Sequence, residues 1–216
     1  MGFVIDNGSL LWHAFLSTLS LAIVSGICAL LLGTVLVAMR VSPIAPLRGL
    51  ATFYVEVFRN TPLTVVFFFL AFGIVHIDLQ FPSRFITAVA ALSLYTAAFV
   101  CEALRSGINA VPPGQAEAAR ALGLDFRQTL TTIVLPQAFR TVVPPLGNVW
   151  IALAKNTSIA AGFAVTELTA SLQRLSNANA DQLLAVFAAI VLAYLAITLP
   201  SAYVIRLVER RVAIVR

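Results

Sequence analysis

Long uncharged stretches of hydrophobic residues alternate with short charged segments along this chain. The first uncharged stretch covers residues 7–39 and predicts a helix over residues 14–39. A helix needs about 20 mostly apolar residues to cross a bilayer, and four further stretches meet this requirement, three of them with one or two charges. These stretches cover residues 50–75, 85–108, 142–163 and 182–205. The pattern therefore predicts an all-α membrane protein with five transmembrane helices.

Composition supports the membrane class. Of the 216 residues, 60% are hydrophobic and 11% are charged, whereas a soluble domain carries about 25% charged residues. This deficit excludes most soluble enzymes, nucleic-acid-binding modules and disordered chains. No Lys or Arg precedes the first stretch, so it lacks the basic region of a cleaved signal peptide, and we expect it to be retained. Without repeats or low-complexity tracts, residues 1–216 are expected to form a single transmembrane domain.

The distribution of the 14 basic residues predicts the orientation. Cytoplasmic loops of membrane proteins carry an excess of Lys and Arg. If the N-terminus is outside and the C-terminus inside, the external loops hold only Arg84 and Arg174, and Arg59 and Lys155 lie within the bilayer. The remaining ten residues all fall in cytoplasmic segments: Arg40, Arg48, Arg105, Arg120, Arg127, Arg140, Arg206, Arg210, Arg211 and Arg216. We therefore expect the N-terminus outside and the C-terminus inside.

A cytoplasmic loop over residues 109–140 joins the third and fourth predicted helices. Pro112 and Pro113 end the preceding helix because proline lacks a backbone N–H. Gln115 and Glu117 then fall in the first turn of a new helix, where a carboxylate favours the positive end of the helix dipole. The loop is therefore predicted to contain a short helix of its own.

The composition of this short helix indicates a contact surface. Alanines dominate it, and Gly123 is a natural C-terminal cap. Such a small-surfaced helix can approach another backbone closely, and Leu122 offers an apolar anchor for a groove. A helical hairpin that merely joins two spans would explain the same pattern, since these boundary signals are generic.

The spacing in this loop resembles the EAA loop of permease subunits in binding-protein-dependent ABC importers. The sequence reads EAA, three residues, Gly, nine residues, Ile, one residue and Leu-Pro. The matching residues are Glu117, Ala118, Ala119, Gly123, Ile133, Leu135 and Pro136. Residues 59–63, 102–107 and 155–158 resemble the polar amino-acid branch of that family, the histidine, glutamine and glutamate type.

The resemblance implies a half-transporter of the bacterial inner membrane with several partners. Its cytoplasmic loop would dock on an ABC ATPase subunit, present in two copies, and a second, related or identical permease subunit would complete the pathway. An extracytoplasmic binding protein would deliver the amino acid. At the start of the external segment, Glu167 is interpreted as a helix cap rather than a contact for that binding protein.

Two basic residues lie inside predicted spans, where an ionisable side chain costs about 2.5–3.5 kcal/mol on insertion scales. Such a residue by default faces protein or water and is a candidate for a substrate path. Arg59 and Lys155 are both expected near the membrane midplane. Two cations there could meet the carboxylates of an amino acid. Neutral hydrogen-bonding residues adjoin them and extend the candidate path: Asn60, Thr61, Asn156, Thr157 and Ser158.

Local ion pairing is an alternative role for these charges. Glu56 and Arg59 lie three residues apart on one helix face, and Glu102 and Arg105 have the same spacing, which allows pairs within one helix. Pro62 frees a backbone carbonyl and predicts a broken or kinked helix that lines a cavity. A cationic path favours an acidic or zwitterionic substrate over a basic one, with glutamate the first expectation and glutamine the second.

The chain carries no motif for catalysis or metal binding. A P-loop requires a lysine after glycine, but the only lysine, Lys155, follows Ala154. ATP and Mg²⁺ are therefore expected on a partner ATPase. This chain is expected to bind no cofactor or nucleic acid and to have no catalytic residue. His13 and His76 are isolated in the sequence and predict no metal site.

Two other functions remain open at this point. One is a secondary carrier driven by an ion gradient, although such carriers usually show inverted repeats and none is visible. The other is a membrane scaffold without a transport role. Small residues of the first helix are candidates for helix contacts, although ordinary membrane-helix composition explains them equally: Ser25, Gly26, Ala29 and Gly33.

Overall fold

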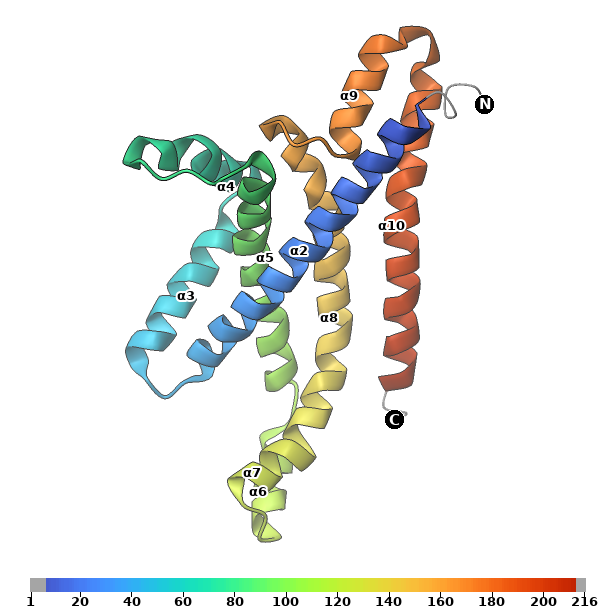
Figure 1. Cartoon of the computed structure of the whole chain (residues 1–216). Coiled ribbons are helices and arrows are strands. Elements are labelled where there is room, and N and C mark those ends of the chain that lie inside the picture. Colours follow the sequence, from blue (N-terminus) through green and yellow to red (C-terminus); the bar gives the residue numbers. More distant parts are fainter. Residues whose placement is uncertain (1–6, 213–216) are drawn as a thin grey trace.

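All regular elements of the described residues are helical (Figure 1). The structure, a computed structural model, describes residues 7–212, apart from the side chains of Phe126 and Val212. Arg216, one of the expected cytoplasmic cations, lies outside the described residues. The predicted all-α class is confirmed.

Within residues 7–212, three helices are long and apolar enough to cross a membrane without a break. They are α2 (Gly8–Val41), α5 (Arg84–Asn109) and a stretch, Ala180–Arg211, that includes most of α10 (Leu183–Val212). Two bent pairs also qualify, so five spans result if each pair counts as one. The pairs are Ala45–Asn60 with Leu63–Ile77, bent by 106°, and Thr129–Phe163 with Leu168–Ala178, bent by 52°.

The bent pairs consist of several shorter elements. The first contains α3 (Ala45–Asn60), α4 (Leu63–Phe68), η1 (Phe69–Gly73) and η2 (Ile74–Ile77). The second contains η3 (Thr129–Val134), α8 (Leu135–Asn156), η4 (Thr157–Phe163) and α9 (Leu168–Ala178), followed by η5 (Ala180–Gln182). Two short helices, α6 (Pro113–Ala121) and α7 (Phe126–Gln128), lie between α5 and η3.

The break in the second predicted span occurs at Pro62, as the sequence predicts. Thr61 is extended, with φ −103° and ψ 132°, because a residue before proline avoids the helical region. The sharpness of the bend was not predicted: residues after Pro62 turn away from α3 rather than continuing a span to residue 75 (Figure 1).

Small residues allow the long helices to approach closely. Figure 1 shows α2 crossing obliquely over α5 and α8. A Cβ added at Gly26 would lie 2.7 Å from the Trp150 ring, and one added at Gly33 would lie 2.5 Å from Val100. Ser25 and Ala29 are fully buried on the same helix. The residues predicted as helix contacts therefore do lie at contacts, where close backbone approach increases packing.

A buried carboxylate joins three helices at the end where α2 begins. The Glu167 side chain caps α9 by accepting from the Ala170 N–H at 2.8 Å, which confirms its interpretation as a cap. It also accepts from the Tyr194 hydroxyl at 2.8 Å. Thr18 of α2 reaches the same group and accepts from the Leu168 N–H at 3.1 Å. This network fixes α9 between α2 and α10.

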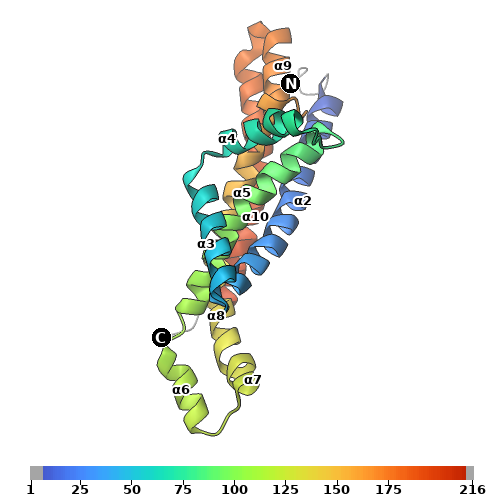
Figure 2. The same ribbon diagram turned by 90° about the vertical axis from the view of Figure 1, so that its left-hand side faces the viewer.

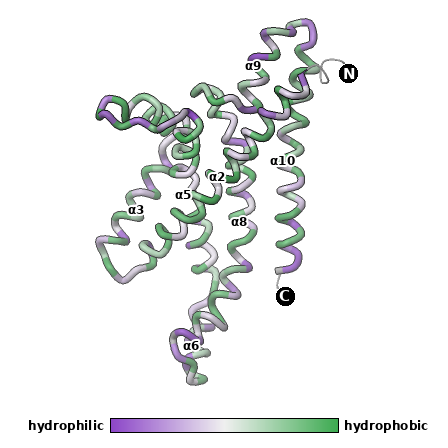
Figure 3. Tube along the Cα trace, in the orientation of Figure 1, coloured by the Kyte–Doolittle hydropathy of each residue, from purple (hydrophilic) through white to green (hydrophobic). Residues whose placement is uncertain are grey.

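Hydropathy along the chain matches this arrangement (Figure 3). The long helices are mostly apolar, and α10 leaves large side chains at the surface, such as Leu184 and Leu192. Figure 2 shows α6 and α7 extending beyond the spans, at the end opposite to the start of α2. The polar loop and the start of α2 are thus separated by the length of the helical bundle.

Candidate functional site

Two prolines mark the start of the helix in the loop. Pro112 occupies the N-cap position and Pro113 the first helical position of α6, because proline suits that position, where no N–H is needed. Gln115 falls in the first turn, as predicted. Glu117 is the fifth residue of α6, so its predicted place in the first turn is wrong. Its side chain is exposed in the second turn.

Gly123 ends this helix in the left-handed conformation, with φ +85°, which confirms it as the C-terminal cap. The Leu124 N–H donates to the Ala119 carbonyl oxygen at 3.2 Å and closes the turn. Ala119 is buried, whereas Leu122 is 83% exposed. The turn therefore fixes a large apolar side chain at the tip of the loop, beside exposed Glu117 and Ala118.

The second half of the loop returns to the bundle through a wide helical turn. Asp125 and Gln128 cap each other reciprocally, with distances of 2.7 and 3.0 Å. The π-helical turn η3 contains half-buried Ile133. Leu135 and Pro136 open α8 and line a mostly apolar cavity of about 640 Å³ between α2, α5 and α8. The loop is thus anchored where the start of α8 lies beside α2 and α5.

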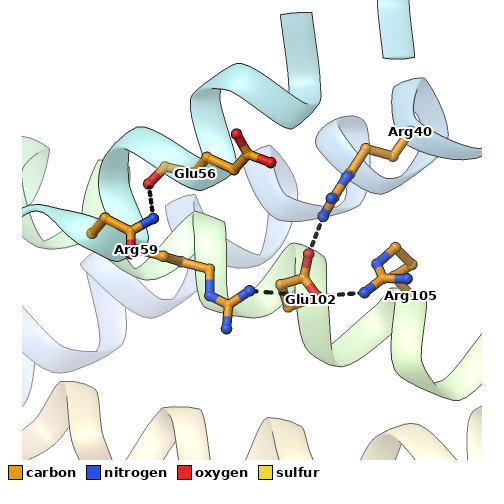
Figure 4. A network of polar contacts seen from close by, with 6 residues as sticks. Arg40, Glu56, Arg59, Glu102 and Arg105 are labelled. Atoms are coloured by element: carbon orange, nitrogen blue, oxygen red, sulfur yellow. Dashed lines mark hydrogen bonds and ion pairs between the residues drawn. The ribbon is translucent and has the colours of Figure 1, made fainter. Parts of the chain in front are cut away.

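Away from the loop, a cluster of charged side chains lies where α2, α3 and α5 meet (Figure 4). Glu102 of α5 pairs with Arg40 of α2 and with Arg105 of its own helix, the latter at 2.8 Å. Arg59 of α3 lies 3.6 Å from the same carboxylate. The Glu102–Arg105 pair expected from the spacing is present. Glu56 forms no ion pair among the described residues, and Arg59 turns to α5 instead.

A cavity of about 270 Å³ lies between α5 and α8, close to the lower end of the range of about 300–1,000 Å³ for small-molecule sites. Its lining is mainly apolar, with polar groups from Thr96, Asn148 and Asn156. The lining residues are Tyr95, Thr96, Phe99, Asn148, Val149, Ala152, Leu153 and Asn156. Of these, sequence reasoning identified only Asn156.

Arg59 adjoins this cavity through an aromatic ring. Its guanidinium carbon lies 6.0 Å from the centroid of the Phe99 ring, within the range of a cation–π interaction. Phe99 lines the cavity, so this ring connects Arg59, next to Glu102, with the cavity that Asn156 also lines.

The other candidate path residues lie elsewhere. Lys155 and Ser158 line a separate cavity of about 330 Å³ between α8 and α10. Thr157 is fully buried, and its hydroxyl donates to the Ala154 carbonyl oxygen at 2.8 Å. At the bend after α3, Asn60 donates to the Glu56 carbonyl oxygen, and Thr61 lines a further cavity, between α3, α4 and α5. Lys155 thus lines a different cavity from the one whose Phe99 ring Arg59 contacts.

No metal centre is evident among residues 7–212, since no group of three or more His, Cys, Asp or Glu side chains converges there.

Comparison with known proteins gives consistent matches. Residues 29–214 match the model of the binding-protein-dependent transport system inner membrane component. The chain is 44% identical over 206 residues to the glutamate transport system permease protein GluC of Corynebacterium efficiens, covering 90% of each chain. It is 35% identical to the probable glutamine ABC transporter permease protein GlnM of Bacillus subtilis, covering 95% of this chain and 94% of the relative. A crystal structure of an amino acid ABC transporter with histidines superposes with a TM-score of 0.89 at 30% identity and 96% coverage of both chains.

Proposed function

This chain belongs to the inner-membrane components of binding-protein-dependent transport systems, and from that membership we propose that it imports a polar amino acid as the permease subunit of an ATP-driven transporter. Glutamate or glutamine is the proposed substrate, because relatives at 44% and 35% identity carry those names. The chain itself is not an enzyme; ATP and Mg²⁺ bind to a partner ATPase.

One observation carries the coupling role: α6 projects beyond the bundle with Leu122 83% exposed at its tip (Figure 2). An apolar anchor on a short helix suits a groove in a partner protein. We propose that this end is cytoplasmic and that two ATPase copies dock there. The proposed coupling residues are Glu117, Ala118, Ala119, Leu122, Gly123, Ile133, Leu135 and Pro136.

The proposed substrate path follows the face formed by α3, α5 and α8. The cavity between α5 and α8 supplies neutral hydrogen-bonding groups, and Arg59 supplies a cation over Phe99, one of the lining residues. Lys155 and Ser158 add a second polar position toward α10. A second permease subunit, identical or related, completes the path across a two-fold axis. The extracytoplasmic binding protein delivers the amino acid at the opposite end from α6.

Reconstitution tests this function. The complete transporter, placed in vesicles with its binding protein, should accumulate glutamate or glutamine only when ATP is present. Glu117→Lys should insert normally but lose both ATPase co-purification and uptake, because it reverses a charge on the exposed face of α6. Asp181→Lys makes the same charge change at an exposed residue outside the loop and should retain the ATPase. Uptake without any ATPase would contradict the proposal.

A further inference from the structure

The ion group around Glu102 contains more positive than negative charge. One carboxylate is shared by Arg40, Arg59 and Arg105, and no second acidic side chain pairs with them among the described residues (Figure 4). Buried or half-buried cations without their own counter-ion are costly. The group therefore has a spare cation that another anion could neutralise.

Arg59 is the most weakly held of the three cations. Its nitrogen lies 3.6 Å from Glu102, beyond ordinary charge-assisted hydrogen-bond length, while Arg105 lies at 2.8 Å and Arg40 forms a hydrogen bond with the same carboxylate. The Arg59 side chain is also the most exposed, at 46%, against 16% for Arg40 and 37% for Arg105. Glu102 would keep two partners if Arg59 moved away.

The cavity beside Arg59 offers a matching destination. Asn148 and Asn156 lie eight residues apart, about two turns, on one face of α8. Neither amide makes a side-chain hydrogen bond within the described part of the chain, nor does the Thr96 hydroxyl across the cavity on α5. Asn148 is exposed, whereas Asn156 is half-buried and Thr96 is buried, and buried polar groups without a partner are unfavourable unless water or a ligand reaches them. The lining contains no carboxylate, so it offers nothing to pair with a cationic side chain.

We propose that Arg59 exchanges partners during transport. It leaves Glu102 and pairs with a carboxylate of the amino acid in the cavity between α5 and α8. Glu102 then acts as a positioning residue: it holds the guanidinium over Phe99 when the cavity is empty and competes with the substrate for it. Asn148, Asn156 and Thr96 bind the remaining polar groups of the substrate. Anionic and neutral amino acids fit this site, and cationic ones do not. The inference depends on the proposed amino-acid transport.

If Glu102 and the substrate compete for Arg59, two variants should change substrate affinity in opposite directions. Arg59→Gln removes the cation and should weaken binding by about tenfold or more, as loss of a charge-assisted bond does. Glu102→Asp keeps the negative charge but retracts the carboxylate from all three arginines, and Arg59, already at 3.6 Å, loses its contact first. Binding should therefore tighten by about threefold. A guanidinium that merely braces α3 against α5 predicts weaker binding in both variants.

The measurement is binding of radiolabelled glutamate and glutamine to the permease–ATPase complex in nanodiscs, without binding protein. Arg48→Gln removes a guanidinium from the same helix, one that donates to the Ser42 and Pro43 carbonyl oxygens, and should bind like wild type. Arg59→Lys keeps a charge and should lose less affinity than Arg59→Gln.

Three results would overturn the inference: equal losses in Arg59→Gln and Glu102→Asp, wild-type binding by Arg59→Gln, or no binding of either amino acid to the wild-type complex. ATP-driven uptake by the complete wild-type transporter is measured in parallel. Normal uptake with any of these results rejects only the exchange, whereas absence of uptake of every polar amino acid rejects the proposed function itself.

Discussion

Gly123 shows how one residue determines the shape of the loop tip. Its φ of +85° costs a residue with a Cβ about 1–2 kcal/mol. We predict that Gly123→Val distorts the turn that presents Leu122 and weakens ATPase docking by about 5- to 30-fold. Gly114→Ala is the matched control, because no atom lies within 4 Å of its added Cβ and its φ is not positive. Equal ATPase affinity of the two variants, measured by titration in detergent, would disprove this role of the turn.

Glu167 offers a second prediction at the scale of a single residue. Its fully buried carboxylate accepts from the Ala170 N–H and the Tyr194 hydroxyl. Glu167→Leu leaves these donors without an acceptor, so the free energy of unfolding should fall by about 2–4 kcal/mol. Glu167→Gln retains an acceptor oxygen for the cap, so its free energy of unfolding should fall less. Tryptophan fluorescence during unfolding in detergent measures both, and identical losses would show that the cap contributes little.

The contact between α5 and α8 is limited by a single glycine. A Cβ at Gly107 would lie 1.9 Å from Val142 and 3.1 Å from the Ala138 carbonyl oxygen. Gly107→Ala should therefore force the helices apart and destabilise the protein by about 1–3 kcal/mol. Val142→Ala in the same chain should restore part of the loss by removing the clashing methyl groups.

A glycine on α3 provides the control for this prediction. Gly49 has no atom within 4 Å of its added Cβ, so Gly49→Ala adds the same methyl group without a clash. Its thermal unfolding temperature in detergent should equal or exceed that of wild type, since alanine favours helix more than glycine. If Gly107→Ala unfolds at the same temperature as Gly49→Ala, the close approach does not limit stability.

At the scale of elements, the sequence predicts helix breaks and caps better than it predicts which residues of different helices contact each other. Pro62 predicts where the second span breaks, because proline acts on its own backbone and its neighbour. It does not predict the 106° bend, which depends on what α4 packs against. Arg59 illustrates the same limit. Its i,i+3 neighbour Glu56 is visible in the sequence, but its actual partner is Glu102, on another helix.

The candidate site has the same limit. Asn156 belongs to a polar run that stands out in an apolar span, whereas Asn148 and Thr96 are isolated in the sequence. Only the packing of α5 against α8 places them around one cavity. The spacing of Asn148 and Asn156, about two helical turns, is the one signal that could have indicated a shared face.

Across the whole molecule, burial divides the helices into central and peripheral ones. The most apolar window of α5 is 56% buried, whereas that of the stretch containing α10 is only 17% buried. Because lipid tails are as apolar as leucine, such a helix gains little from burial within one chain. The large exposed face of α10 is therefore available to lipid or to the proposed second permease subunit.

Orientation provides the last prediction, because it determines which end of the bundle meets ATP. The excess of arginines at the loop end predicts that α6 is cytoplasmic and α9 external. In a chain with Cys28→Ala and Cys101→Ala, an impermeant maleimide should label Asn177→Cys, exposed on α9, in intact spheroplasts. It should label Leu122→Cys only after permeabilisation. The reverse pattern would place α6 where no ATPase could reach it, and both the coupling role and the direction of transport would then fail.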